Sequence, residues 1–331
     1  MSCLMSTPIN WGIIGPGKIA RNFAIGLQAC PDAQLLAVGS RDKNRSKQFA
    51  EEFSVPRSYD SYQALTDDKN VDAVYIATPH PYHVSACLLG LEAGKNILCE
   101  KPLTVNEIET KTVIAKAKET GLLLMEGMWT RFFPAIQTLR NIVGEGIIGD
   151  LSAVKADLGF FSSKNTKSRL FSPQLAGGAL LDVGIYCVSF ASMLLNKPEK
   201  VTAVSKLTSE GVDECTSLSL SYKNGAVASL FCGITTNSLQ QAYIFGEKGK
   251  IVVHEPFWKA NKLTVELYNG EKTVHQHPIE SNGFNYEASH FMNLIQTNQT
   301  DSPIMPQTES LEIIKIIDIA RKMIGLKYPF E

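Results

Sequence analysis

An acid and a phenol lie four residues apart in an apolar segment, where Asp182 and Tyr186 follow the glycine pair Gly177-Gly178. On a helix, residues at this spacing share a face. Apolar surroundings shift the pKa values of such groups, which suits them to proton transfer. The segment therefore predicts half of an active site. The alternative is a buried hydrogen-bonded pair with no catalytic role.

A lysine able to activate the tyrosine stands in Glu100-Lys101-Pro102, directly after a predicted strand over 96–99. A free tyrosine has a pKa of about 10, too high for an efficient base near neutrality. An ammonium at about 4 Å contributes roughly 4 kcal/mol at an effective dielectric constant near 20. That lowers a phenol's pKa by about three before burial opposes it. We expect Lys101 to activate Tyr186, and Asp182 to orient Lys101 or the substrate hydroxyl; otherwise Lys101 is a solvated loop residue.

A glycine-rich turn of the form G-x-G-x-x-A runs from Gly15 to Ala20, after a predicted strand over 9–14 and before a predicted helix over 18–28. In this context Gly15 permits the tight turn, Gly17 lets the backbone approach a pyrophosphate, and Ala20 lets the helix pack on the sheet. The free N–H groups of the helix favour phosphate binding. The turn predicts a dinucleotide site, against the alternative of a turn without a ligand.

The end of the second predicted strand, Gly39-Ser40-Arg41, indicates which dinucleotide binds. An NAD site usually has a carboxylate here for the ribose 2′-hydroxyl, whereas arginine binds a 2′-phosphate with paired donors. Ser40 adds a hydroxyl, and Arg45 follows one helical turn later. These residues favour NADP. In the alternative, Arg41 is a solvated loop residue and Asp42 serves the ribose.

A loop with two histidines, His80 and His83, follows Thr78 at the end of a predicted strand over 71–77. Ligands of open parallel sheets bind at this edge. Because no third ligand is evident, we predict no metal site. Contacts to the cofactor or to the backbone are expected instead.

The elements that position these residues alternate between strands and helices in the first part of the chain. Strands are predicted over 9–14, 34–39, 59, 71–77, 96–99 and 122–125, and helices over 18–28, 44–53, 83–93 and 106–120. Such alternation predicts an α/β fold with a parallel, doubly wound sheet. We place this dinucleotide-binding Rossmann domain at residues 1–126.

Residues 127–331 form the predicted substrate-binding and oligomerisation domain. A helix is expected over 129–143, then period-two segments over 151–158, 201–207, 216–222, 226–235, 241–245, 250–254 and 263–268, and a final helix over 310–324. Asn224-Gly225 predicts a hairpin turn. We expect a large, open, mostly antiparallel sheet with one face under helices and the other free to pair with a second subunit.

Composition excludes several function classes for the 331-residue chain, which is 44% hydrophobic with a net charge of −1. This charge favours neither nucleic acid nor an anionic membrane. No segment reads as long and apolar enough to span a bilayer, and Met1–Asn10 lacks a signal-peptide pattern. Seven irregularly spaced cysteines without a CxxC pair fit reduced thiols in the cytoplasm.

Four segments together resemble the glucose–fructose oxidoreductase / inositol dehydrogenase / rhizopine-catabolism (Gfo/Idh/MocA) family over essentially the whole chain. They are the glycine-rich turn, Glu100-Lys101-Pro102, Gly177 to Tyr186, and Met125 to Pro134. Within the family, the chain is similar to the dimeric dihydrodiol dehydrogenase branch, which includes NADP-dependent D-xylose dehydrogenases. Many other members carry histidine at the position of Tyr186.

The resemblance implies a catalytic pair, Lys101 and Tyr186, with Asp182 nearby. The expected cofactor-binding residues are Gly15, Gly17, Lys18, Ile19, Ala20, Ser40, Arg41, Arg45, Thr78, His80, His83, Glu100, Lys101, Trp129 and Arg131. The expected substrate-binding residues are Trp129, Phe160, Asp182, Tyr186, Trp258 and Phe284. For Phe160, Trp258 and Phe284 the alternative is a core role.

The resulting expectation is an NADP-dependent oxidoreductase. It transfers a hydride between the nicotinamide and a hydroxyl-bearing carbon of a sugar or vicinal diol, or reduces the matching carbonyl. A homodimer through the open sheet is expected, with a tetramer as the alternative. Two other functions remain open: a glycosidase of the same family that uses tightly held NAD, and a non-catalytic NADPH sensor.

Overall fold

The structure, a computed structural model, describes residues 8–163 and 168–331. Contacts divide the chain into two units. Unit 1 comprises Met1–Thr104, Ile108–Trp129 and Ile279–Ser310, and unit 2 comprises Val105–Glu107, Thr130–Pro278 and Leu311–Glu331. This division differs from the predicted boundary at residue 126, because a late segment of the chain joins the first unit.

Unit 1 contains a six-stranded parallel sheet with the order β3-β2-β1-β4-β5-β6, as in a doubly wound nucleotide-binding fold. Its strands are β1 (Ile9–Ile14), β2 (Ala33–Gly39), β3 (Arg57–Tyr59), β4 (Ala73–Ile76), β5 (Asn96–Glu100) and β6 (Leu124–Gly127). Each predicted strand is present to within a few residues. The strand order reverses between β1 and β4, which is where ligands bind in such sheets.

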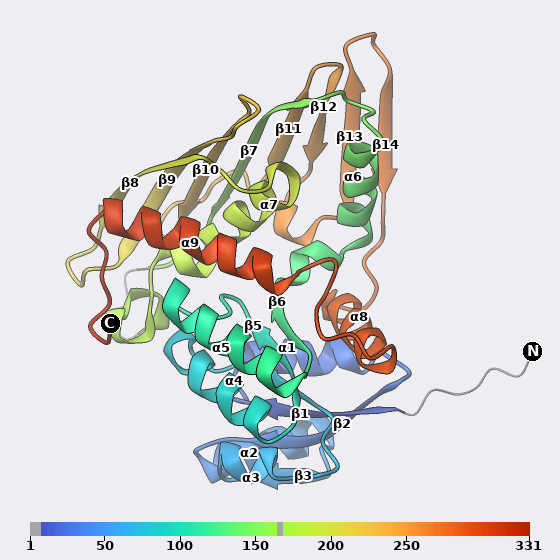
Figure 1. Cartoon of the computed structure of the whole chain (residues 1–331), viewed down its shortest axis with the longest axis vertical. Helices are drawn as coiled ribbons and strands as arrows, with labels where there is room; N and C mark the ends of the chain where they lie inside the picture. Colours follow the sequence, from blue (N-terminus) through green and yellow to red (C-terminus); the bar gives the residue numbers. More distant parts are fainter. Residues whose placement is uncertain (1–7, 164–167) are drawn as a thin grey trace, which may run out of the picture. The chain divides into compact units, whose positions relative to one another are not determined.

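The helices of unit 1 connect and cover this sheet (Figure 1). They are α1 (Lys18–Leu27), α2 (Lys43–Phe53), α3 (Tyr62–Thr66), α4 (His83–Glu92), α5 (Glu107–Thr120) and α8 (Phe284–Gln296). Ser61 caps α3, since its hydroxyl accepts the Ala64 N–H at 3.1 Å.

Helix α8 was not predicted from the sequence. It packs on α1 so closely that a Cβ on Gly26 would lie 2.6 Å from the Cβ of Phe284. Asn282, just before α8, donates to the Asn22 carbonyl at 2.6 Å. These contacts place α8 in unit 1.

Unit 2 contains an eight-stranded sheet with the order β14-β13-β12-β11-β7-β10-β9-β8 (Figure 1). Its strands are β7 (Leu151–Gly159), β8 (Lys200–Leu207), β9 (Asp213–Ser221), β10 (Val227–Gly233), β11 (Ala242–Gly246), β12 (Gly249–Val253), β13 (Lys262–Leu267) and β14 (Lys272–Gln276). All neighbouring pairs are antiparallel except β7 and β10. The predicted hairpin at Asn224-Gly225 joins β9 to β10, with Gly225 at φ +85°. Strand β14 was missed because it is mostly exposed and lacks apolar alternation.

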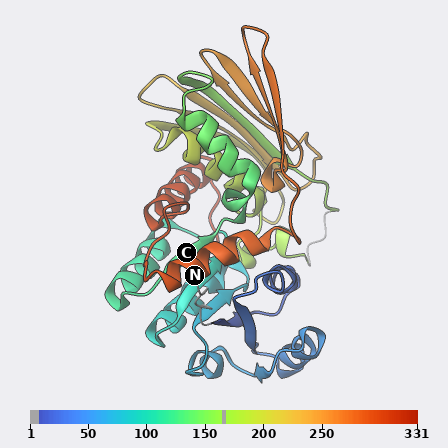
Figure 2. The same cartoon turned by 90° about the vertical axis from the view of Figure 1, so that its right-hand side faces the viewer.

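Three helices of unit 2, α6 (Pro134–Gly144), α7 (Ile185–Leu195) and α9 (Gln307–Met323), belong with this sheet. The side view in Figure 2 shows α6 lying along one face of the sheet. The single helix expected over 129–143 is wrong: a 3₁₀ turn over Trp129–Phe132 ends before α6, which begins at Pro134. Proline forces the preceding residue out of helical geometry, and Phe133 is accordingly extended.

The helical segment Pro173–Leu195 corrects one expectation from the sequence. By length and composition alone it could cross a membrane, although no such segment was expected. Within the fold, 78% of its most apolar 18-residue stretch is buried. This burial is what a core helix of a folded unit shows.

Candidate active site

The segment that carries Asp182 and Tyr186 is a π-helical turn over Leu180–Gly184 followed directly by α7. A plain α-helix was expected. Single π-helical turns occur frequently at functional sites. Gly184 lies so close to β10 that a Cβ there would meet the Cys232 sulfur at 2.8 Å, so the widened turn sits tightly on the sheet.

The glycine pair before the turn is required by its surroundings. Gly178 has φ +113°, and a Cβ there would lie 2.1 Å from Oδ1 of Asp213. A Cβ on Gly177 would lie 2.6 Å from the carbonyl oxygens of Arg169 and Leu170. Only glycine fits at either position without displacing backbone or a buried carboxyl group.

Asp213 on β9 anchors the start of the turn, a role that the sequence analysis missed. Its Oδ2 accepts the Leu180 N–H at 2.7 Å and the Thr216 hydroxyl at 2.8 Å. It therefore satisfies a backbone donor at the opening of the helix. No motif in the sequence marks Asp213, because its partners come from β9 and from a turn more than 30 residues away.

Asp213 is fully buried, and burial raises its pKa to about 6, against the lowering by its hydrogen bonds from Thr216 and Leu180. Its usual pKa is 3.8. Between about pH 4 and 6 the folded state therefore binds more protons at Asp213 than the unfolded state, and the free energy of unfolding falls as pH rises through this window. This contribution amounts to about 3 kcal/mol.

We expect Asp213→Asn to remove that pH dependence. The measurement is the free energy of denaturant unfolding of the wild type and the variant at several values between pH 4 and 7. The difference in the free energy of unfolding between the wild type and Asp213→Asn should change by up to about 3 kcal/mol between pH 4 and 6. Asp150→Asn, at an exposed carboxylate, is the matched control. Parallel profiles for wild type and Asp213→Asn would contradict the assignment.

Asp182 forms an ion pair with Arg169, whose Nη2 lies 2.7 Å from Oδ1 of Asp182. Asp182 is 7% exposed, so this charge is largely removed from water. Arg169 is a second residue that the sequence analysis missed, because an isolated arginine outside any motif carries no signal. The pair leaves a charged arginine beside the acid predicted to orient substrate.

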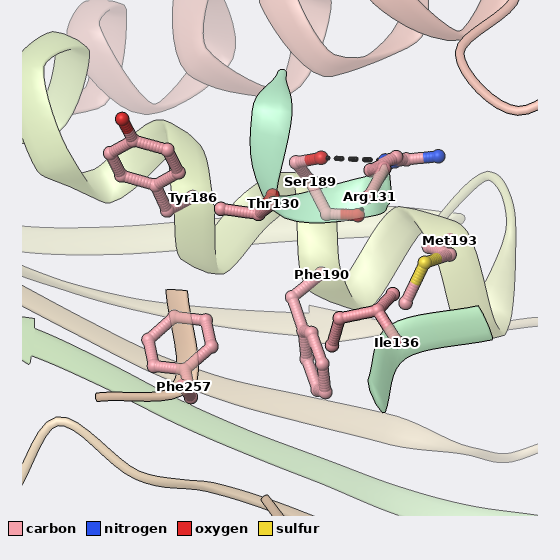
Figure 3. A pocket seen from close by; sticks show the side chains of 8 residues that line it. All are labelled: Thr130, Arg131, Ile136, Tyr186, Ser189, Phe190, Met193 and Phe257. Atoms are coloured by element: carbon pink, nitrogen blue, oxygen red, sulfur yellow. Dashed lines mark hydrogen bonds between the residues drawn. The ribbon is translucent and has the colours of Figure 1, made fainter. Parts of the chain in front are cut away.

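Tyr186 is half-buried, and its ring centre lies 6.4 Å from that of Trp258. The structure thus brings together two of the predicted substrate-binding residues. In Figure 3 the hydroxyl of Tyr186 points away from Phe257, which lies beneath the ring. The Trp258 indole N–H donates to Gln240 at 3.4 Å, which orients the indole.

Arg131, predicted near the nicotinamide, is buried against α7. Its Nε donates to the Ser189 hydroxyl at 3.0 Å and its Nη2 to the Ser189 carbonyl at 2.8 Å (Figure 3). Ser189 lies three residues after Tyr186, so Arg131 anchors the helical turn that carries the tyrosine. A cavity of about 10 Å³ lies here, room for one water molecule. It is lined by Thr130, Arg131, Ile136, Tyr186, Ser189, Phe190, Met193 and Phe257.

The glycine-rich turn of unit 1 has the geometry of a phosphate site. Gly15 has φ +88°, and a Cβ there would lie 3.0 Å from the Ala77 carbonyl at the end of β4. Helix α1 begins after Gly17 with no side-chain cap and no acidic residue in its first turn. Its N-terminal N–H groups are thus not capped by a side chain and can meet phosphates. Ala20 is fully buried, Ile19 is half-buried and Lys18 is exposed.

A buried hydroxyl supports the fit of a nucleotide at this point. Oγ1 of Thr78 follows β4, is buried, and has no hydrogen-bond partner among the described residues. Its methyl group would contact a Cβ on Gly15 at 3.1 Å, so both residues face the same crevice. A buried polar group of this kind calls for a partner, and a nucleotide bound in the crevice between β1 and β4 would supply one.

Arg41 lies at the end of β2, exposed, with its guanidinium carbon 4.8 Å above the ring of Tyr82 and 6.0 Å from that of Tyr62. Stacking of this kind orients a guanidinium while leaving its edge free to bind. Asp42 instead caps α2: its Oδ1 accepts the Asn44 N–H at 2.9 Å and the Arg45 N–H at 3.4 Å. Ser40 is buried, and its hydroxyl accepts the Asp42 N–H at 3.1 Å.

His83 links two loops at the carboxyl edge of the sheet. Its Nδ1 lies 2.8 Å from the Pro102 carbonyl and its Nε2 lies 2.8 Å from the Thr78 carbonyl. The expected backbone contact is confirmed for His83, which is fully buried. His83 thereby joins the loop of Lys101 to the nucleotide crevice. His80 is also buried, with its ring centre 5.8 Å from that of His83.

Lys101 is half-buried directly after β5, which neighbours β4 in the sheet. Glu100, predicted to bind cofactor, is only 7% exposed and accepts a hydrogen bond from the hydroxyl of Tyr75. Cys99, next to it, is a fully buried core residue.

The remaining aromatic residues divide between the units. Trp129 is 8% exposed and stacks on Phe284 in unit 1, with 4.4 Å between ring centres. Phe284 is 3% exposed and also packs against Phe23. Phe160 is half-buried in unit 2, where its N–H donates to the Gly233 carbonyl at 3.1 Å. Phe284 thus occupies a packing position in unit 1.

Within residues 8–163 and 168–331, no group of three or more His, Cys, Asp or Glu side chains could hold a metal ion. All six cysteines in the described part of the chain are free thiols, and Cys3 lies outside it.

Comparison with known proteins identifies the family. Residues 9–128 match the model described as "Oxidoreductase family, NAD-binding Rossmann fold", and residues 136–252 match the "GFO/IDH/MocA C-terminal domain". The chain is 40% identical to the mouse (Mus musculus) trans-1,2-dihydrobenzene-1,2-diol dehydrogenase over 97% of this chain and 98% of the relative. It is 38% identical to the human enzyme of that name, with the same coverage.

Solved structures of other oxidoreductases share the fold of this chain. A 3-ketoreductase from Actinomadura kijaniata, in complex with NADP and TDP-benzene, is 26% identical, with a TM-score of 0.86 over 96% of this chain and 98% of that one. An aldose-aldose oxidoreductase from Caulobacter crescentus shares the fold, with 24% identity and a TM-score of 0.87 over 96% and 97% of the two chains. The chain is therefore an oxidoreductase of the Gfo/Idh/MocA family, with dihydrodiol dehydrogenases among its relatives.

Proposed function

We propose that this enzyme transfers a hydride between NADP and a hydroxyl-bearing carbon of a sugar or vicinal diol, or reduces the matching carbonyl. The observation that carries the proposal is the place of Lys101. It follows β5, one strand away from the crevice between β1 and β4 where nucleotides bind in such sheets. The relatives named as diol dehydrogenases and as a 3-ketoreductase support the substrate class.

The proposed reaction gives each residue one task. Bound NADP supplies the hydride acceptor or donor. Oη of Tyr186 takes the proton of the substrate hydroxyl during oxidation and returns it during reduction. The ammonium of Lys101 stabilises the tyrosinate and polarises the same substrate oxygen. Asp182, held by Arg169, orients the substrate hydroxyl.

The preference for NADP over NAD rests on the end of β2. Arg41 is exposed and stacked on Tyr82, whereas the carboxylate of Asp42 is occupied by the cap of α2. Arginine with a free edge binds a 2′-phosphate through paired hydrogen bonds. The buried hydroxyl of Ser40 and the exposed Arg45 complete this proposed phosphate site.

The test is the initial rate of NADP⁺ reduction across aldoses, inositols and vicinal diols, with NAD⁺ in parallel. We expect turnover with NADP⁺ on an aldose or a diol. Arg41→Ala should raise KM for NADP⁺ by about 10–100-fold, because it removes charge-assisted hydrogen bonds, and should leave the NAD⁺ reaction nearly unchanged. Lys47→Ala, at another exposed cation on α2, is the control. Equal losses with both cofactors would contradict the role of Arg41.

Two alternative functions have distinct outcomes in the same experiment. Net hydrolysis of a glycoside without added cofactor would indicate a glycosidase that uses tightly held NAD. Binding of NADPH with no turnover on the whole panel would indicate a sensor. The presence of Lys101, Asp182 and Tyr186 together favours the dehydrogenase, since a sensor needs none of them.

The proposal includes a cytoplasmic homodimer. The free thiols fit a reducing compartment. Exposed apolar side chains on the strands of unit 2 fit an interface between copies: Val204 is 72% exposed and Val227 49%. The mass of the purified protein in solution, by sedimentation velocity, distinguishes a dimer from a monomer or a tetramer.

A further inference from the structure

A buried hydrogen bond in unit 1 joins Tyr75 to Glu100, the residue before Lys101. Tyr75 on β4 pairs in register with Leu98 on β5, so its side chain emerges on the same face as Glu100, two residues further along. Tyr75 is fully buried, and its hydroxyl donates to Oε1 of Glu100. Oε2 of Glu100 accepts the backbone N–H of Lys101 at 3.2 Å. Each oxygen of Glu100 thus receives one donor, which is the pattern that stabilises a carboxylate.

A second acid, Glu287 on α8, is buried near the same cluster. It has no exposed surface, and neither of its oxygens has a hydrogen-bond partner among the described residues. Burial and the proximity of Glu100 hold the pKa of Glu287 well above its usual range. A carboxyl group in such a place stays protonated, because an uncompensated buried charge is very costly.

The groups that face Glu100 decide where the negative charge resides. Burial raises the pKa of Glu100, and so does Glu126 on β6, whose Oε1 accepts the Leu103 N–H at 3.0 Å. The Tyr75 hydroxyl, the Lys101 N–H and the Lys101 charge lower it. Since Glu287 stays neutral, it adds no repulsion against an ionised Glu100. The positive charge of Lys101, the next residue in the chain, favours the ionised form of Glu100.

We propose that Tyr75 is a positioning residue for Lys101: its hydroxyl holds the Glu100 carboxylate in place as the counter-ion of the Lys101 ammonium. The catalytic role of Lys101 towards Tyr186 comes from the function proposed above. The contacts of Tyr75, Glu100 and Lys101, which keep Lys101 charged, do not depend on that function. Tyr75 lies buried in unit 1 and acts through Glu100.

Removing the Tyr75 hydroxyl leaves Glu100 with one donor fewer, so that the carboxyl group is protonated at higher pH. Lys101 then loses its counter-ion, and its own pKa falls. We expect Tyr75→Phe to lower the pKa of Lys101 by about one unit, which increases its neutral-amine fraction about tenfold at a fixed pH below that pKa. The phenyl ring keeps the stacking of residue 75 on Phe23, where the ring centres lie 3.6 Å apart.

The experiment measures the pH dependence of reductive methylation of Lys101 in the full chain, by peptide mass spectrometry, without cofactor or substrate. Tyr59→Phe is the matched control, because the Tyr59 hydroxyl donates to a carboxylate in the same unit, Asp68, at 2.9 Å. It should leave the methylation of Lys101 unchanged. Glu287→Gln replaces one neutral group by another and should change the rate less than twofold.

Glu100→Gln should lower the pKa of Lys101 at least as far as Tyr75→Phe does, and adding Tyr75→Phe to it should have no further effect. An unchanged Lys101 profile in Tyr75→Phe would overturn the proposal, as would additive effects in the double variant. A shift in Glu287→Gln would show that Glu287 is ionised and overturn its assignment. A shift in Tyr75→Phe without turnover on any sugar or diol would support this inference while refuting the proposed function.

Discussion

Replacing Tyr186 by phenylalanine, or Lys101 by methionine, is expected to reduce kcat by about 10²–10⁴-fold, the usual contribution of general acid–base catalysis. Tyr186→Phe removes the atom that carries the proton. Lys101→Met keeps the length and the apolar stem but removes the charge that stabilises the tyrosinate. The measurement is steady-state turnover of NADP⁺ with the best substrate of the panel.

Two further measurements separate loss of chemistry from loss of folding. Both variants should bind NADPH with nearly wild-type affinity, measured by titration of cofactor fluorescence. Tyr243→Phe is the matched control in unit 2, because Tyr243 lies on β11 and its hydroxyl donates to the side chain of Gln241 at 2.6 Å. It should retain full activity. Retention of most activity in either Tyr186→Phe or Lys101→Met would refute the proposed mechanism.

The largest expected effect on stability comes from Gly178→Ala. A Cβ at this position would lie 2.1 Å from Oδ1 of Asp213, and φ is +113°. The substitution therefore adds backbone strain and displaces the carboxyl group that holds the Leu180 N–H. We expect a loss of about 3 kcal/mol or more in the free energy of unfolding. Activity should fall as well, because the same turn leads into Tyr186.

Gly270→Ala measures the effect of backbone strain alone on the free energy of unfolding. Gly270 has φ +98°, and a Cβ there would meet no atom within 4 Å. This variant should lose only about 1 kcal/mol, measured by denaturant unfolding under the same conditions. If the two variants lost the same amount, the close contact with Asp213 would not be the reason that glycine is required at position 178.

The parallel sheet of unit 1 was predictable because each of its strands leaves a local signal. Ile9–Ile14 is a short apolar strand followed by a glycine turn, and Gly94 ends α4 with φ +78°. Turn chemistry and apolar runs act within a few residues of the chain. Helix α8 and strand β14 escaped prediction, because α8 begins without a capping side chain and β14 lacks an apolar face.

The residues of the candidate site also fall into two groups, those that the sequence could indicate and those that it could not. The glycine turn, Arg41, Lys101 and Tyr186 stand out as residue types at informative positions in the chain. Their supporting residues, Arg169, Asp213, Tyr75 and Glu287, do not. Arg169 pairs with an acid 13 residues later, and Asp213 caps a turn 33 residues earlier. Such partners are chosen by packing and carry no pattern of their own.

The sequence by itself therefore determined the strands of the parallel sheet, the nucleotide turn and the types of the proposed reacting groups, since these depend on local backbone preferences and short motifs. Only the tertiary structure decided the protonation and orientation of those groups. Burial gives Asp213 its raised pKa, and α8 brings a second buried acid, Glu287, whose pKa burial and Glu100 hold well above its usual range. Desolvation and distant hydrogen bonds set the charge of a buried group, and both depend on segments that meet only in the folded chain.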